Sequence, residues 1–224
     1  MNLWTWPDGL VWRATRTITE RSRHQRFDIF MQLAKPNPSD RVLDVGVGAG
    51  ESRALNFFEE WYPWRAHITA LATEDLPTFR KQYPEIQLVI GDGRTLPFAD
   101  HSFDLVVSNA VLEHVGTKND QRRFIAEACR VGKRVVLSTP NRWFPVDAHT
   151  MIPFAHWLPL GMRNAIYRKL ARDYYASEER LRLLGLRELV QLLPKNTTYK
   201  IHRQRLLGWT ANINILIERR KKYI

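Results

Sequence analysis

Short apolar runs alternate with stretches of helical periodicity over most of this 224-residue chain. Five of the apolar runs have the length and composition of buried β-strands. They lie at residues 41–45, 67–71, 86–90, 103–108 and 133–138. Strands of this kind that alternate with helices predict a parallel sheet covered by helices on both faces, so the pattern favours an α/β fold.

A long helix is predicted ahead of the first strand. Within residues 19–34, four apolar side chains recur at the spacing of one helix face, namely Phe27, Phe30, Met31 and Ala34. Prolines follow this stretch and end it. Further helices are expected at residues 51–61, 75–82, 120–130, 163–172 and 186–193.

The two ends of the chain and one internal segment depart from this alternation. The chain closes with alternating runs at residues 198–205 and 211–218 around Gly208, which predict a hairpin at the sheet edge. Four prolines between residues 139 and 176 indicate an insertion over the sheet. Residues 1–18 hold three tryptophans near a proline and a glycine, and indicate an arm rather than a regular element.

A chain of this length supports one sizeable hydrophobic core, and we therefore expect a single domain. Its expected parts are an N-terminal arm and helix (1–35), a core (40–140), an inserted cover (141–184) and a terminal helix with the hairpin (185–224).

Composition narrows the class of protein. Hydrophobic residues make up 44% and charged residues 25%, which is typical of a soluble globular chain rather than a disordered one. The chain contains no apolar run of membrane-spanning length, and its N-terminus lacks the pattern of a secretion signal. The single cysteine, Cys129, excludes an internal disulfide and a multi-cysteine metal site. We expect a cytoplasmic protein.

Positive charge is concentrated at the flanks of the chain. Residues 195–224 hold eight basic residues and one acidic residue, whereas residues 27–140 hold 13 basic and 15 acidic residues. This distribution fits a basic surface for anionic partners, and it also fits the solvated surface of an arginine-rich protein. Charge alone leaves both interpretations open.

Candidate chemistry begins where the first predicted strand ends. Glycines at positions 46, 48 and 50 follow Asp44 in the turn DVGVGAG. Such a turn lets the backbone approach a ligand, and the next helix directs its N-terminal amides into the same crevice. A nucleotide-like ligand at the carboxyl edge of the sheet is the natural inference. Two further motifs follow the third and fourth strands, GDG at residues 91–93 and SNAVLEHV at residues 108–115.

Together, these three motifs resemble the class I S-adenosylmethionine-dependent methyltransferases, and within them the type 11 group. The resemblance covers about residues 40–140, and the terminal hairpin also matches the family's sheet. It implies a Rossmann-like, mostly parallel sheet of seven strands with helices on both faces, the last strand antiparallel, and a helical cover inserted after strand five.

The resemblance also implies a cofactor, S-adenosylmethionine, and the residues that hold it. These are Asp44 for the methionine amino group, Gly46 and Gly48 for the methionine part, Asp92 and Gly93 for the adenine, and Ser108 and Asn109 for backbone carbonyls near the amino group. The family usually has an acidic residue at the end of strand two for the ribose, where this chain has Ala72. Glu74 or Asp75 would have to reach the ribose instead.

Candidate catalytic groups lie close to the fourth strand and in the insertion. His114 follows that strand on the cofactor side and is the first candidate for a general base, with Glu113 beside it, while His149 and His156 are further candidates. A base matters for a hydroxyl acceptor, which must lose a proton of high pKa. Helix capping and packing are alternative roles for the same side chains, and no metal site is expected.

The acceptor pocket is expected between the N-terminal helix and the insertion. Aromatic side chains of the insertion would either line it for a ring or lipid-like acceptor or form a second small core; they are Trp143, Phe144, Phe154, Trp157 and Tyr167. The expected function is methyl transfer to a small-molecule or lipid-like acceptor by direct in-line displacement.

Two other functions stay open at this stage. A nucleic-acid methyltransferase would fit the basic flanks. Residues 108–111, however, read Ser-Asn-Ala-Val where such amine methyltransferases usually carry Asn/Asp-Pro-Pro-aromatic, which argues against nucleic acid as a partner. A non-catalytic cofactor-binding protein would fit the departure at Ala72. Methyl transfer to a small or lipid-like acceptor is also compatible with peripheral contact between an anionic membrane and the tryptophan-rich arm and basic tail. We expect a monomer or a homodimer.

Overall fold

A computed structural model of the chain describes residues 10–48 and 56–220, without the side chains of residues 10–18. The described residues form one seven-stranded sheet with the strand order β3-β2-β1-β4-β5-β7-β6. The strands are β1 (Val42–Val45), β2 (Ile68–Ala72), β3 (Gln87–Ile90), β4 (Phe103–Asn109), β5 (Gly132–Pro140), β6 (Thr197–Leu206) and β7 (Trp209–Arg219).

The sheet topology confirms the expected fold class. Strands β1 to β5 pair in parallel, whereas β7 runs antiparallel between β5 and β6. The terminal hairpin is present at the sheet edge, and its turn contains Gly208 with a φ of +83°. Strands β1 and β4 meet at the centre, where Leu43 pairs with Val106. Their carboxyl ends therefore lie next to each other at one edge of the sheet.

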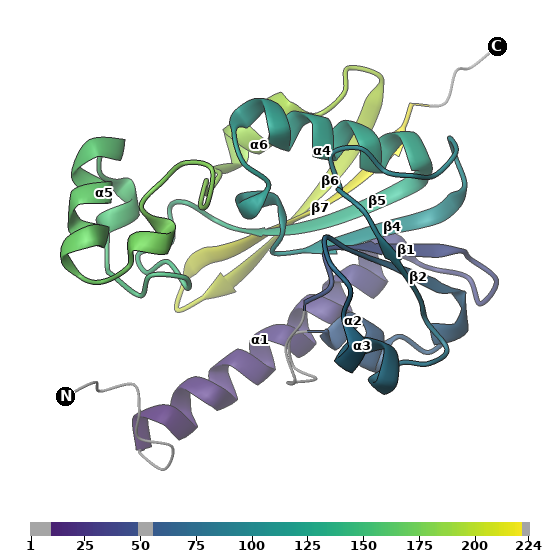
Figure 1. Cartoon of the computed structure of the whole chain (residues 1–224), viewed down its shortest axis with the longest axis horizontal. Coiled ribbons are helices and arrows are strands. Elements are labelled where there is room, and N and C mark those ends of the chain that lie inside the picture. Colours follow the sequence, from purple (N-terminus) through teal and green to yellow (C-terminus); the bar gives the residue numbers. More distant parts are fainter. Residues whose placement is uncertain (1–9, 49–55, 221–224) are drawn as a thin grey trace.

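Helices cover both faces of this sheet, as Figure 1 shows. The helices are α1 (Leu10–Ala34), α2 (Phe57–Trp61), α3 (Pro77–Gln82), α4 (Lys118–Val131), α5 (Leu160–Lys169) and α6 (Leu186–Leu192), with short 3-10 turns η1 (Arg65–His67), η2 (Leu112–His114), η3 (Ala155–Trp157) and η4 (Asp173–Tyr175). Helices α4 and α6 pack against one face through residues such as Phe124 and Leu189. Helices α1, α2 and α3 pack against the other through Phe30, Phe57 and Phe79.

The N-terminal region differs from the expectation. Helix α1 begins at Leu10, so the irregular arm predicted for residues 1–18 is wrong for residues 10–18. These residues contain neither proline nor glycine, and nothing in them interrupts a helix that continues to Ala34. Residues 1–9, and residues 51–55 of the helix predicted at 51–61, lie outside the described residues, and α2 (Phe57–Trp61) falls in the rest of that range.

The cover occupies residues 141–184 between β5 and α6, and it lies beyond the carboxyl end of β5 (Figure 1). A bridge between Asn141 and Leu184 closes its base. Its own small core contains Ala155, Tyr167 and Ala176.

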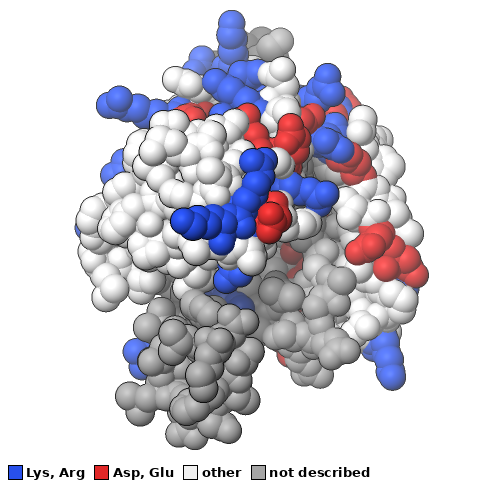
Figure 2. Space-filling view, turned by 60° about the vertical axis from the view of Figure 1, so that its left-hand side comes forward, with Lys and Arg blue, Asp and Glu red and all other residues white. Residues whose placement is uncertain are grey.

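The five aromatic side chains predicted for the acceptor pocket do not share one environment. Tyr167 is fully buried in the small core, whereas Trp143 and Phe154 are more than half exposed, at 55% and 52%. Figure 2 views the molecule from this side and shows Lys and Arg side chains beside surface that carries no charge. None of the described helices is both long and apolar enough to cross a membrane.

The glycine turn gives the first testable consequence. Gly46 has a φ of +102°, and a Cβ atom at this position would lie 2.3 Å from Val111 Cγ2. We expect Gly46→Ala to reduce the free energy of unfolding by about 2 kcal/mol or more, because the left-handed backbone and the overlap both cost energy. Gly161→Ala is the matched control, since no atom lies within 4 Å of its Cβ position. Urea unfolding measures both; equal stability of the two variants would contradict the packing described.

Candidate active site

The glycine turn after β1 is held open by hydrogen bonds to its neighbours. The amides of Gly46 and Val47 both donate to the carbonyl of Leu71 in β2, at 2.9 and 3.3 Å. The Asn56 side chain grips Gly48 from the other side, accepting from its amide at 3.0 Å and donating to its carbonyl at 3.1 Å. A small pocket results, lined by Asp44, Gly46, Val47, Asn56, Phe57, Phe58, Glu59 and Asn109. Gly50 lies outside the described residues.

Two buried carboxyl groups meet in this pocket. Asp44 of β1 and Glu59 of α2 are 6% and 1% exposed. Burial, the charge of Glu59 and a hydrogen bond between the two groups raise the pKa of Asp44 well above its ordinary value. Burial also raises the pKa of Glu59, although the hydrogen bond from Asp44 opposes this. One oxygen of Glu59, Oε1, is buried without a hydrogen-bond partner among the described residues. The pair therefore favours a shared proton or a cationic ligand.

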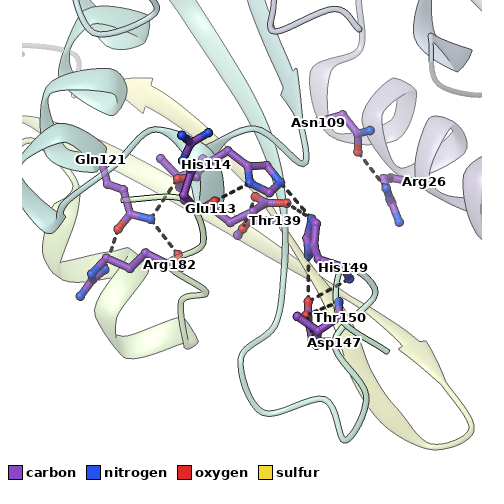
Figure 3. A network of polar contacts seen from close by, with 12 residues as sticks. Arg26, Asn109, Glu113, His114, Gln121, Thr139, Asp147, His149, Thr150 and Arg182 are labelled. Atoms are coloured by element: carbon purple, nitrogen blue, oxygen red, sulfur yellow. Dashed lines mark hydrogen bonds and ion pairs between the residues drawn. The ribbon is translucent and has the colours of Figure 1, made fainter. Parts of the chain in front are cut away.

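The end of β4 connects the pocket to helix α1. The Ser108 hydroxyl donates to the Val45 carbonyl at 2.8 Å and ties β4 to β1. The Asn109 side chain accepts from Arg26 Nη1 at 2.9 Å (Figure 3). Burial lowers the pKa of Arg26 to about 10, an effect that the charge of Glu113 opposes. Arg26 thus brings a positive charge from α1 to the strand ends.

The residues predicted for adenine and ribose do not line this pocket. Asp92 binds the Arg94 guanidinium, with 2.6 Å between Oδ2 and Nη2, and this hydrogen bond lowers the pKa of Asp92. Gly93 packs closely, since a Cβ atom there would lie 2.5 Å from the Phe124 ring. Glu74 is exposed in the loop after β2, and Ala72 is the last residue of that strand, as expected.

The three predicted catalytic residues are brought together by the fold, as Figure 3 shows. Glu113 and His114 belong to η2 directly after β4, and His149 comes from the cover. The two histidines face each other with 2.9 Å between their Nε2 atoms. Glu113 is fully buried, and its Oε1 atom lies 3.9 Å from His149 Nε2.

Polar contacts hold each member of this cluster in place. Asp147 accepts a hydrogen bond from His149 Nδ1 at 2.8 Å. Burial favours the neutral imidazole, but Asp147 and Glu113 outweigh it and raise the pKa of His149. His114 Nδ1 lies 3.0 Å from the Arg180 carbonyl. His156, the remaining candidate, binds the Phe144 carbonyl through Nε2 and stays apart from the cluster.

A buried amide braces the η2 turn against the end of the cover. Gln121 Nε2 donates to the carbonyls of Leu112 and Arg182, each at 2.9 Å, and its Oε1 accepts from Arg182 Nη1 at 2.6 Å. The backbone amide of Arg182 donates to the Glu113 carbonyl at 2.8 Å. The position of Glu113 therefore depends on α4 and the cover together.

Sequence reasoning missed several residues of this site. Asp147 carried a local signal, because an aspartate two residues before His149 can accept from the amides that follow it, and it does so from His149 and Thr150. Glu59 and Arg26 have no local sequence signal that marks them as site residues. Each is a charged residue in a helical stretch, and only the fold shows that it points inward.

Comparison with known proteins agrees with this geometry. A family model described as "Methyltransferase domain" matches residues 43–135, which run from β1 into β5. Over this segment, which is less than half of its length, the chain is similar to a methyltransferase domain.

Two curated proteins with methyltransferase names are similar to part of this chain. A demethylmenaquinone methyltransferase of Roseiflexus sp. (strain RS-1) is 30% identical over 131 residues, covering 56% of this chain and 51% of its own length. A malonyl-[acyl-carrier protein] O-methyltransferase of Methylococcus capsulatus is 29% identical over 131 residues, covering 51% and 46%. The chain thus spans about half the length of these curated relatives.

Solved structures extend the likeness to the whole fold. The Burkholderia thailandensis 1,6-didemethyltoxoflavin-N1-methyltransferase, solved with its substrate and S-adenosylhomocysteine, superposes with a TM-score of 0.59 at 15% identity, over 89% of this chain and 79% of that one. The described part of this chain therefore has the fold of that structure, with the candidate residues at the carboxyl edge of the sheet.

Proposed function

We propose that the chain transfers a methyl group from S-adenosylmethionine to a small-molecule or lipid-like acceptor by direct in-line displacement. The observation that carries this proposal is the placement of two polar clusters at one sheet edge. The glycine-turn pocket follows β1, and the histidine cluster follows the neighbouring strand β4. A donor and an acceptor held at these two places would be side by side, which is the main requirement for methyl transfer.

The pocket fits the cofactor's charge. We propose that Asp44, Gly46, Gly48 and Asn109 hold the methionine end, because the buried carboxyl pair of Asp44 and Glu59 has an unpaired oxygen that an ammonium group could satisfy. Bound S-adenosylmethionine supplies an activated methyl group and a positive charge. Contacts of Asp92, Gly93, Glu74 and Ser108 with the cofactor remain predictions from the family resemblance.

The histidine cluster fits the acceptor side. A hydroxyl acceptor must lose its proton as the new bond to carbon forms, and His114 and His149 present Nε2 atoms that can assist this loss. Glu113 and Asp147 balance the positive charge that an imidazole gains. This arrangement favours an oxygen acceptor, and the relatives reported above lend no support to a nucleic-acid substrate.

The cover supports the further proposal that the enzyme touches an anionic membrane surface, where a lipid-like acceptor would reside. Several apolar side chains of the cover are about half exposed: Trp143, Phe154, Leu160, Met162 and Leu170. Basic residues lie among them at Arg168, Lys169 and Arg172. Such a mixture suits a lipid interface. Residues 1–9 of the arm and residues 221–224 of the basic tail, two segments to which the sequence assigned this contact, lie outside the described residues.

Three other expectations stay predictions. The division of the chain into one domain with an inserted cover is supported by the bond between the cover's base and α6, where Arg142 lies 4.0 Å from Glu188. A cytoplasmic location rests on the single cysteine, which is buried. A monomer or homodimer is expected.

Cofactor binding is tested first by thermal unfolding. S-adenosylhomocysteine at 100 times its dissociation constant should raise the melting temperature by about 5 to 10 °C, whereas NAD should not. Asp44→Asn should lose most of this shift, because it removes the charged acceptor, while Asp28→Asn on the exposed side of α1 should keep it. Absence of any shift with adenosyl ligands would overturn the proposed function.

Membrane contact is tested by sedimentation with vesicles. The chain should bind vesicles that contain phosphatidylglycerol at low salt and release them at high salt. Met162→Glu should weaken binding, because it places a carboxylate on the exposed apolar surface, whereas Tyr199→Glu at the far end of β6 should not. Absence of binding to anionic vesicles at low salt would contradict the proposed membrane contact.

A further inference from the structure

The histidine pair is placed in an arrangement that two neutral imidazoles cannot satisfy. His114 Nε2 and His149 Nε2 lie 2.9 Å apart, at hydrogen-bonding distance (Figure 3). The protonation of each ring follows from the partner of its other nitrogen. His149 Nδ1 faces the carboxylate of Asp147, and His114 Nδ1 faces the backbone carbonyl of Arg180. Both partners are acceptors, so both Nδ1 atoms carry hydrogen.

Each Nε2 atom therefore presents a lone pair to the other. Two lone pairs at this distance repel each other unless a positive centre lies near both. A third lone-pair donor faces the same region. Glu113 Oε2 accepts from the Thr139 hydroxyl at 3.0 Å, but its Oε1 is fully buried and has no hydrogen-bond partner among the described residues. One ligand atom from each of Glu113, His114 and His149 can be chosen so that all three lie within 4.8 Å of one another.

We propose that Glu113, His114 and His149 bind a divalent transition-metal ion. Two imidazoles and one carboxylate form a ligand set that suits zinc, manganese, iron(II) or cobalt. Two nitrogens at about 2.05 Å from one ion are about 2.9 Å apart at the right angle of octahedral coordination and about 3.3 Å apart at the tetrahedral angle, so the observed separation of 2.9 Å favours an octahedral ion over tetrahedral zinc.

The surroundings have the features of a built metal site. Ligating histidines generally donate their second N–H to a carboxylate or a backbone carbonyl, which orients the ring. Asp147 and the Arg180 carbonyl do this here, and Asp147 is itself fixed by the amide and the hydroxyl of Thr150, at 2.9 and 2.8 Å. A proton shared by the histidines would satisfy both rings, but it would leave Glu113 Oε1 without a partner. A metal ion satisfies all three atoms.

This inference rests on the proposed function and refines it: with an ion bound, the histidine Nε2 atoms hold the metal, and the ion takes the place of an imidazole base in activating the acceptor hydroxyl. Three protein ligands leave coordination positions open, and His114 is on the exposed side of the cluster. An oxygen of the acceptor can occupy such a position. Coordination lowers the pKa of a bound hydroxyl, so its proton leaves to solvent while the oxygen gains the methyl group. The inferred substrate class is a hydroxyl-bearing acceptor whose oxygen binds the ion.

Metal binding is measured without cofactor or acceptor. The full chain, treated with a chelator and desalted, is titrated with Co²⁺ and with Zn²⁺ by calorimetry, and the visible spectrum of the Co²⁺ form is recorded. We expect one ion per chain. His114→Ala should abolish this site, and Asp147→Asn should weaken it about 10- to 100-fold by releasing the His149 ring. His202→Ala, an exposed histidine on β6, is the matched control and should bind like the parent chain.

The outcomes separate this inference from the proposed function. A chain that binds no ion, or a His114→Ala variant that keeps the melting temperature and binds as tightly as His202→Ala, would overturn the metal site even if methyl transfer is found. A chain that binds one ion through His114 but takes no S-adenosylhomocysteine would retain the metal site and refute the proposed function. Methyl transfer at full rate in metal-free protein would refute the role of the ion in holding the acceptor.

Discussion

Burial of the central strands on both faces is the constraint on which the site depends. Val42, Leu43 and Val106 are fully buried between two layers of helices, so these strands expose no face on which a polar site could form. Polar chemistry is confined to the ends of the strands, and the parallel arrangement brings the carboxyl ends of β1 and β4 to the same edge. The glycine turn and the histidine cluster lie close together because both follow the carboxyl ends of neighbouring parallel strands.

The second constraint is the cost of burying charge. Asp44, Glu59 and Glu113 are buried carboxyl groups, and burial raises the pKa of each. Such groups destabilise a fold unless a proton or a positive partner accompanies them. Glu59 and Glu113 each retain an oxygen without a partner among the described residues. We interpret both carboxyl groups as sites that lower the stability of the unliganded fold and bind a positively charged group.

The sequence predicted what depends on local pattern. Apolar runs marked the strands, and the motif after each strand fixed which residues reach the carboxyl edge, including Ala72 at the end of β2. Contacts between segments far apart in the chain could not be predicted from the sequence pattern. The approach of His149 to His114 depends on the path of an irregular cover, and the inward direction of Glu59 depends on how α2 packs on the sheet. Neither has a periodic signal in the chain.

The central claim is that the buried carboxyl groups of the glycine-turn pocket bind a positively charged ligand group. Calorimetric titration of S-adenosylhomocysteine in two buffers of different ionisation enthalpy tests it directly. Burial raises the pKa values of both Asp44 and Glu59, so the pair keeps a proton to higher pH than ordinary carboxyl groups do, and an arriving ammonium group favours its release. The account predicts proton release on binding, seen as a heat that depends on the buffer. Binding with the same heat in both buffers, or with proton uptake, would contradict it.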